Sequence, residues 1–385
     1  MKQCKKKTTN IQYQYFYSYK NLPEVWDSFL PDAHYLKSKN LKVTEEADLP
    51  HISFLYVLIR NNECPVLVTA FQLLRFEDRH INQELVKPYQ YFFWRFFVRV
   101  AKPKLLVAGH LFRHDVNTCY FTNELSDYNA FIYHSTAIEN AVKKIKANAA
   151  LIKDMPSKMA KYFQRYKPEY QIFKNDISME MEIDIAWESL NDYEEALKHK
   201  YAQRFRKIRK QWKGIVLKEL GIDEVIENKK ELYKLYQMVC DHQQVRLGFI
   251  SEDFIPNLKT YYKEKLRVWG IYSDDIMIGF FSAWDKEEEF DMFYIGFDYK
   301  KNNKYSLYFN ILFFSIEKAI ELKKKKLTLG RTALDAKARL GCSPKYLSTY
   351  LYISNPFLRR RIATVQNNTN EKEGAWEQRH PFKKQ

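Results

Sequence analysis

Two histidines, His110 and His114, stand four residues apart and are followed by Asp115. On a helix this spacing would put two metal ligands on one face. The apolar run 105–112 predicts a strand instead, and residues four apart in a strand are separated by about 13 Å at ~3.3 Å per residue. That distance is too long for one zinc ion. We therefore interpret the histidines as structural or surface groups and expect no metal.

The segment 198–213 is strongly basic and contains no acidic residue. As a helix it would place Tyr201, Phe205, Ile208 and Trp212 on one apolar stripe. Its other faces carry Lys200, Arg204, Arg206, Lys207, Arg209, Lys210 and Lys213. Two interpretations are open: the stripe packs on a core while the cations stay in water, or the helix binds tRNA or an anionic membrane surface. The net charge of +16 favours a polyanionic partner without choosing one.

The aromatic stretch 89–100 is interrupted by Arg95 and Arg99. It is too short and too charged to span a bilayer. It could lie on a membrane with the arginines reaching the headgroups. We expect instead a buried amphipathic helix, whose two arginines, one turn apart, could mark the polar edge of a cleft.

Several function classes find no support in the chain. It has only 10 glycines, with neither a dinucleotide-binding fingerprint nor a P-loop, and no nucleophile triad can be placed by spacing. The start, 1–7, lacks the apolar core of a signal peptide. Five scattered cysteines without a C-x-x-C pair indicate reduced thiols. We therefore expect a cytoplasmic protein without a transmembrane segment.

The elements that must position any site occur in the same order twice: hairpin, strand, helix, strand. In the first half they are expected at 52–59 with 66–76, 105–112, 136–148 and 149–152. In the second half they are expected at 266–272 with 276–284, 290–297, 305–322 and 327–329. No sequence repeat accompanies this order, which indicates an architectural duplication. With 385 residues, the chain is long enough for two domains.

The duplication predicts an α/β (α+β) fold of two mixed, twisted sheets flanked by helices. We expect the first half at 1–175 and the second at 216–365. Between them, 176–215 would form a connector strand and the basic amphipathic helix. The last residues, 366–385, are polar and lack periodicity, so we expect a loose tail.

Each half resembles the GNAT acetyltransferase fold in its order of elements. The runs 304–312 and 327–342 resemble the closing part of the acyl-CoA core of that family. The connector, at 187–193 and 200–207, is similar to FemAB-like proteins, which join two GNAT-like halves. The resemblance covers about residues 50–355. It implies an N-acyltransferase that passes an acyl group from acyl-CoA, most simply acetyl-CoA, to an amine by direct attack.

The resemblance also implies where the donor binds. Backbone N–H groups of strand 290–297, around Phe293, Tyr294 and Ile295, would polarise the donor carbonyl. The pyrophosphate would lie on the turn 298–306, where the following helix begins. Its expected contacts are Lys300, Lys301, Asn302, Asn303, Lys304, Tyr305 and Ser306. The turn departs from the family because it lacks glycines, and it could equally be a solvated lysine loop.

Anchoring the resemblance on Gly341 places two further residues at family positions. Lys337 stands where the family has a tyrosine, and as an ammonium it could protonate or neutralise the leaving thiolate. Arg331 stands at the asparagine position and could clamp a carboxylate or phosphate, or form a surface ion pair with Asp335. An acidic residue near Asp291 or Asp298 would relay the proton of the attacking amine through water.

Two other functions remain open. A FemAB-type enzyme would take an aminoacyl group from tRNA, and the basic helix at 198–213 supports that alternative. A non-catalytic binding protein could have kept the double fold, because the glycine-rich turn and the family tyrosine are both missing. The acceptor would be a small-molecule or peptide amine. We expect the second half to bind the donor and the first half to shape the acceptor side.

Overall fold

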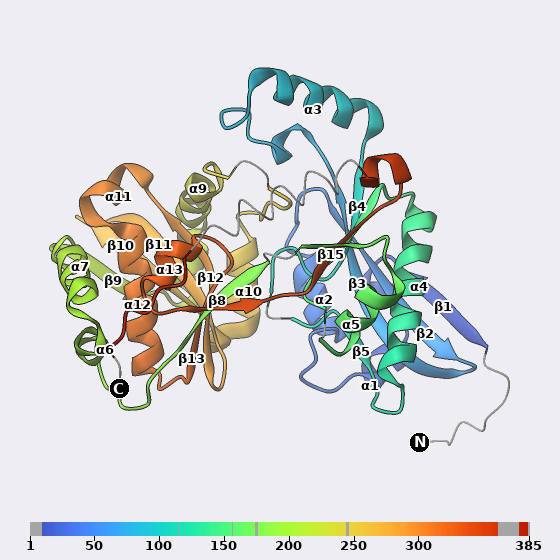
Figure 1. Ribbon diagram of the computed structural model, residues 1–385, viewed down its shortest axis with the longest axis horizontal. Coiled ribbons are helices and arrows are strands. Elements are labelled where there is room, and N and C mark those ends of the chain that lie inside the picture. The colour runs from blue at the N-terminus through green and yellow to red at the C-terminus, as the bar shows by residue number, and fades with distance from the viewer. Residues whose placement is uncertain are drawn as a thin grey trace. The chain divides into compact units, whose positions relative to one another are not determined.

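The computed structural model describes residues 10–114, 116–155, 157–173, 176–243, 246–360 and 377–383. These residues form two compact units, each with its own sheet (Figure 1). The described part of the N-terminal unit comprises 10–173, 246–250 and 347–360. That of the C-terminal unit comprises 176–243, 251–346 and 377–383.

The N-terminal unit is built on an eight-stranded mixed sheet. Its strands lie in the order β1 (Ile11–Phe16), β2 (Ile52–Asn61), β3 (Cys64–Arg75), β4 (Lys104–Ala108), β6 (Ala149–Ile152), β15 (Thr349–Ile353) and β7 (Gln171–Phe173), with β5 (Cys119–Phe121) paired to β3. Only β4 and β6 are parallel among the strand pairs described in this sheet. Its helices are α1 (Glu24–Phe29), α2 (Ser38–Glu45), α3 (Pro88–Ala101), α4 (Asp127–Ile145) and α5 (Ser157–Tyr166), with short 3₁₀ turns η1 (Tyr19–Asn21) and η2 (Asp78–His80).

Helix α4 shows how apolar spacing forms this core. Phe131, Ile138 and Val142 recur at helical spacing and are buried in the cluster that packs on the sheet. Ser126 caps the first turn, because its hydroxyl accepts a hydrogen bond from the Asn129 N–H at 3.2 Å. The helix ends at Lys146, which adopts a left-handed conformation.

The C-terminal unit has a seven-stranded mixed sheet. The strands lie in the order β14 (Ser343–Tyr346), β8 (Ile177–Glu182), β13 (Lys326–Gly330), β12 (Glu289–Phe297), β11 (Ile276–Asp285), β10 (Leu266–Ser273) and β9 (Ile215–Glu219). The helices are α6 (Leu190–Ala196), α7 (His199–Lys210), α8 (Ile222–Glu227), α9 (Lys229–Cys240), α10 (Phe254–Tyr262), α11 (Tyr299–Tyr305), α12 (Leu307–Glu321) and α13 (Leu334–Ala338), with the 3₁₀ turn η3 (Lys263–Lys265). The two mixed sheets flanked by helices confirm the predicted fold class.

The two sheets exchange strands. β8 follows β7 in the chain but pairs with β13 and β14 of the C-terminal sheet. β15 follows β14 but pairs with β6 and β7 of the N-terminal sheet. The compact units therefore do not follow chain order: the connector from 176 onward lies in the C-terminal unit, and 347–360 lie in the N-terminal one.

The basic segment forms α7, and its apolar stripe packs in the C-terminal core as the first interpretation expects. Phe205 and Ile208 are buried, and Tyr201 and Trp212 are half-buried against the same cluster. The indole ring of Trp212 lies 4.7 Å from the ring of Phe314 between centroids. Packing of this stripe leaves most of the cationic side chains at the surface.

Three expectations need correction. The stretch 89–100 does form a helix, α3, but its aromatic side chains are exposed rather than buried. The predicted helix over 305–322 is divided, because Ser306 adopts a left-handed conformation between α11 and α12. Cys119, Cys240 and Cys342 are buried free thiols, but Cys64 is disulfide-bonded, so the expectation that every thiol is reduced does not hold there.

The end of the polar tail packs on the C-terminal unit. Phe382 forms a bridge with Leu197 and contacts the rings of Trp187 and Tyr193. It also lies over Gly341, where a Cβ would come within 2.2 Å of its ring. Backbone hydrogen bonds add to this contact, from the Lys198 N–H to the Pro381 carbonyl at 2.8 Å and from the Lys383 N–H to the Ala196 carbonyl at 2.9 Å. The polar composition of the tail does not predict this packing of 377–383. Residues 366–376 lie outside the described residues.

Candidate active site

The parallel strands β12 and β13 separate near their middle (Figure 1). They pair at Glu289 with Lys326, at Phe290 with Leu327 and at Asp291 with Thr328, and no further pair follows between these two described strands. Beyond this point β12 continues along β11, and β13 continues along β8. The C-terminal part of β12 therefore presents a backbone edge toward a gap in the sheet.

A bulge fixes the orientation of this edge. The β11–β12 register shifts between Phe281 and Ala283, where Ser282 fills the irregular position. Its hydroxyl accepts from the Tyr294 N–H at 3.0 Å and donates to the Tyr294 carbonyl at 3.1 Å. Beyond the bulge the backbone groups alternate, so the N–H of Ile295, the residue after Tyr294, points away from β11 and toward the side of β13. Phe293 lies within the register shift, where the alternation is interrupted. A backbone donor at such an edge suits the polarisation of a carbonyl oxygen.

The opposite constraint on β12 comes from α9. A Cβ at Gly296 would lie 2.6 Å from backbone atoms of Leu235 and Tyr236, so only glycine lets the helix approach the strand this closely. The side chain of Tyr294 packs in this interface, with ring centroids 5.5 Å from Tyr236 and 5.9 Å from Phe254. Burial raises the pKa of Tyr294. The Tyr294 side chain therefore belongs to the core between α9 and β12, and the edge of β12 offers backbone groups to the gap.

Lys337 lies just beyond the end of β13. It is 3% exposed on α13, and its Nζ donates to the carbonyl of Gly330, the last residue of β13, at 3.2 Å. Burial lowers the pKa of this ammonium to about 8. A buried lysine with such a pKa can exchange a proton near neutral pH, which fits the acid role that the resemblance implies.

Three titratable groups, those of Lys337, Tyr308 and Tyr193, lie near the buried thiol of Cys342. Burial raises the pKa of the Cys342 thiol to about 12, so it remains protonated at neutral pH. The Tyr193 hydroxyl donates to the Leu340 carbonyl at 2.9 Å.

Tyr308 is a candidate that sequence reasoning missed. Its hydroxyl is buried and has no hydrogen-bond partner among the described residues, and burial raises its pKa. An unpartnered buried hydroxyl is costly, and a hydroxyl close to a candidate acid can donate to a substrate atom. One signal was present in the sequence, a tyrosine in the first turn of α12, but core packing explains such a residue equally well.

The expected pyrophosphate turn is a closed helical segment. Residues 299–305 form α11, and Asp298 caps it by accepting from the Lys300 N–H at 2.9 Å. Asn302 in turn accepts from the Tyr308 N–H at 3.0 Å, which occupies a donor in the first turn of α12. The helix terminus that a pyrophosphate would use is therefore partly capped by the protein.

The remaining residues of this segment hold the two helices together or face water. Ser306 is hydrogen-bonded to Gln211, and the Asn310 amide donates to the Tyr305 carbonyl at 2.8 Å. A further hydrogen bond from Lys304 contributes to lowering the pKa of Tyr305. Lys300, Asn303 and Lys304 are exposed and Lys301 is half-buried. The lysines could supply positive charge for a pyrophosphate, but without glycines the backbone of this segment does not allow the phosphates the close approach typical of the family.

Two of the expected polar residues are engaged in ion pairs. Asp291 is 1% exposed and accepts from the Lys286 Nζ at 2.6 Å, at the last β12–β13 pair. Arg331 pairs with Asp176 at 3.2 Å, not with Asp335. The expected surface pair between Arg331 and Asp335 is wrong, because Asp335 forms its ion pair with Arg339 instead.

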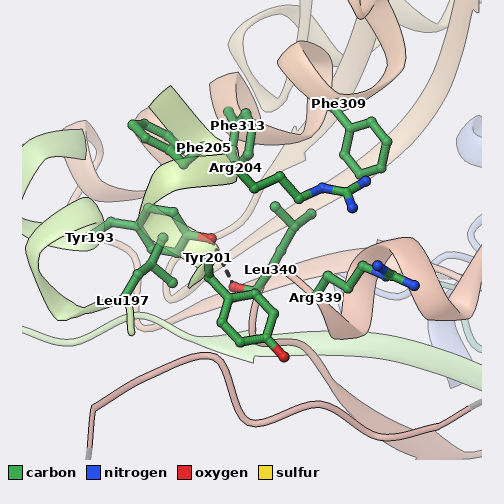
Figure 2. Close-up of a pocket in the computed structure, with 9 residues that line it drawn as sticks. All are labelled: Tyr193, Leu197, Tyr201, Arg204, Phe205, Phe309, Phe313, Arg339 and Leu340. Atoms are coloured by element: carbon green, nitrogen blue, oxygen red, sulfur yellow. Dashed lines mark hydrogen bonds between the residues drawn. The ribbon is translucent and has the colours of Figure 1, made fainter. Parts of the chain in front are cut away.

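A hollow lies between α6, α7, α12 and the end of α13 (Figure 2). It is a shallow depression with a cavity volume of about 10 Å³, room for about one water molecule, and its aromatic walls include Tyr201 and Phe309. The guanidinium of Arg204 lies 4.9 Å from the Phe309 ring centroid. Burial and the nearby charge of Arg339 lower the pKa of Arg204. Arg339 pairs with Asp335 at 2.7 Å, so Arg204 is the guanidinium here that suits a phosphate linked to a base.

The other sites weighed from the sequence are not assembled. His110 is buried, and its Nδ1 accepts from the N–H groups of Phe112 and Arg113, both at 3.1 Å. Within the described residues, no group of three His, Cys, Asp or Glu side chains could hold a metal ion. None of the helices found in that part of the chain combines the length and apolarity needed to cross a membrane.

Comparison with solved structures agrees with this fold. A crystal structure of FemX superposes with a TM-score of 0.51 at 10% sequence identity, covering 91% of this chain and 100% of that chain. A tandem GNAT protein from the clavulanic acid biosynthesis pathway gives 0.51 and 10%, covering 90% and 99%. No protein-family model matches the sequence, and no curated protein matches it. The predicted fold of two GNAT-like halves, as in FemAB-like proteins, is confirmed.

Proposed function

We propose that the protein is an N-acyltransferase whose reaction takes place at the gap between β12 and β13. The observation that carries this proposal is the end of β12–β13 pairing at Asp291 and Thr328, with a buried lysine beside the end of β13. This arrangement combines a backbone edge that can polarise a carbonyl with a group that can hold a proton.

In the proposed reaction, the Ile295 N–H at the edge of β12 binds the donor carbonyl oxygen. The neutral acceptor amine attacks the carbonyl carbon, a C–N bond forms, and the bond to the leaving oxygen or sulfur breaks. Lys337 in its ammonium form donates a proton to the leaving group, and Tyr308 is a second candidate donor. The proton lost by the amine passes to water.

The carboxylates contribute structure in this proposal. Asp291 neutralises Lys286 at the point where the strands part, and Asp298 caps α11. Because both carboxylates already have these partners, we assign neither Asp291 nor Asp298 as the general base. Arg331 is fixed by Asp176 at the other side of β13 and holds β8 to β13.

Between the two donors, we propose aminoacyl-tRNA rather than acyl-CoA. Acyl-CoA needs a phosphate-binding turn, and the segment meant for it is helical and partly capped. An aminoacyl-tRNA needs a basic surface and a site for its terminal nucleotide. Helix α7 supplies exposed cations, and the shallow hollow supplies the charge of Arg204 beside the aromatic ring of Phe309.

Equilibrium binding distinguishes the donors. A mixed pool of aminoacylated tRNA should bind saturably and weaken steeply between about 50 and 200 mM salt, because several phosphates are neutralised. Acetyl-CoA should not bind at millimolar concentration. Saturable acetyl-CoA binding with no tRNA binding would reverse the choice of donor and leave the transfer reaction standing.

The proposal of an enzyme has its own test. Labelled aminoacyl groups should pass from the tRNA pool to primary amines when the protein is present. Lys337→Met should abolish most of the transfer while tRNA binding persists. Binding of tRNA without transfer to any amine tested would favour a binding protein that kept the double fold.

A further inference from the structure

Helix α3 turns an apolar face away from the protein. Six of its side chains, Tyr89, Phe92, Phe93, Phe96, Phe97 and Val100, are 44 to 68% exposed. At about 100° per residue they fall within a sector of about 140° on one side of the helix. A helix on a globular protein normally turns such a face toward the core, so this arrangement is inverted. Figure 1 shows α3 standing clear of the strands of its sheet.

The opposite side attaches the helix to the N-terminal unit. Val98 is the buried residue of α3, and the Trp94 ring meets Phe76 edge to face at 5.6 Å. Arg95 and Arg99 both reach Asp78, each at 3.1 Å. These contacts fix the orientation of α3, so the outward apolar face belongs to the folded structure.

The charges around this face are of one sign. No acidic residue occurs between Glu84 and Asp115 in the sequence. The same stretch contains cations at both ends of the helix and along its flank: Lys87, Arg95, Arg99, Lys102 and Lys104. Asp78 offsets only one of these charges. The surface is therefore apolar at its centre and basic at its edges, within a chain of net charge +16.

We propose that α3 is an interfacial helix that binds the surface of an anionic lipid bilayer. A helix of 14 residues is about 21 Å long and can lie in the interface plane with its rings below the headgroups. The lysines at the two ends of the helix, Lys87 and Lys102, reach the lipid phosphates, while Arg95 and Arg99 stay paired with Asp78. A second copy of the chain is a poorer occupant, because it would bring an equally basic surface against this one. The inference does not depend on the proposed transfer reaction.

Vesicle sedimentation with the full chain tests this inference. Vesicles of phosphatidylcholine with about 30 mol% phosphatidylglycerol should bind the protein, and pure phosphatidylcholine should bind it more weakly. The double variant Phe92→Ser/Phe96→Ser should lose about tenfold in affinity for the anionic vesicles. The matched control is Phe357→Ser, since Phe357 is 65% exposed on the same unit and lies outside α3. It should bind as the wild type does.

A second readout locates the contact. Tryptophan at position 96, introduced by Phe96→Trp, should shift its emission to the blue on anionic vesicles and be quenched by brominated lipid, whereas Phe357→Trp should show neither change. Equal vesicle binding by the double variant and the control would overturn the proposal. So would the absence of vesicle binding, or a dimer in sedimentation that the double variant abolishes without any lipid binding by the wild type.

Discussion

Replacing the buried lysine at position 337 with methionine should stabilise the protein at neutral pH and destroy its activity. Folding lowers the pKa of Lys337 from 10.5 to about 8 because its ammonium loses water. The difference corresponds to about 3 kcal/mol of unfavourable free energy in the folded state at pH 7. Methionine has a similar shape but no charge. It loses the hydrogen bond to the Gly330 carbonyl, worth about 1 kcal/mol. The net gain at pH 7 is about 2 kcal/mol.

The size of this gain in stability depends on pH. Between pH 8 and 10.5 the unfolded chain binds more protons at this lysine than the folded protein does, so the wild type gains stability as pH rises. Near pH 10 the penalty has fallen below 1 kcal/mol, and the advantage of the variant should vanish.

Urea unfolding of Lys337→Met and wild type at pH 7 and pH 10 measures this effect. Lys207→Met, a change at an exposed position on α7, serves as the control and should show no comparable pH-dependent difference. A variant less stable than the wild type at pH 7, or a stability difference that does not change with pH, would refute the reasoning that Lys337 carries a buried, destabilised charge.

Three further predictions concern the strand, its bulge and the hollow. Gly296→Ala should lower the free energy of unfolding by about 2 kcal/mol, because its Cβ would clash with α9. Gly221→Ala meets no atom closer than 3.8 Å and should cost only about 1 kcal/mol, for the lost N-cap glycine of α8, in the same urea titration. Ser282→Ala should lower kcat more than it raises KM, because the Tyr294 backbone loses partners that orient β12; an unchanged kcat would contradict this role. Arg204→Gln should weaken tRNA binding and reduce the slope of log affinity against log salt by about one, unlike Lys39→Gln on the other unit; equal slopes in filter binding would remove Arg204 from the site.

The order of elements could be predicted from the sequence because apolar spacing is local. The hairpin of β2 and β3, the strand β12 and the helix α4 all follow from periodicity and turn residues. The exchange of β8 and β15 could not be predicted, because pairing partners far apart in the chain leave no periodic signal. A strand's own residues show that it is buried, but not in which sheet.

The role of Lys337 stays a prediction. The resemblance pointed to this residue through its position relative to Gly341, and the structure adds its burial and lowered pKa, which the sequence does not show. The helical conformation of 298–306 could not be predicted. It depends on the Asn302 side chain, which caps the first turn of α12, and a loop sequence does not reveal such a cap. The exposed face of α3 was interpreted wrongly for a related reason: an amphipathic pattern does not say which face meets the protein.

The most direct measurement is a structure of the protein with an amide-linked, non-hydrolysable aminoacyl-adenosine bound. We expect the donor carbonyl oxygen to lie within hydrogen-bond distance of the Ile295 N–H, with the Lys337 Nζ near the linking atom and the adenine beside Phe309. A donor carbonyl bound anywhere else on the chain, with the edge of β12 unoccupied, would contradict the proposal that this gap is the site of acyl transfer.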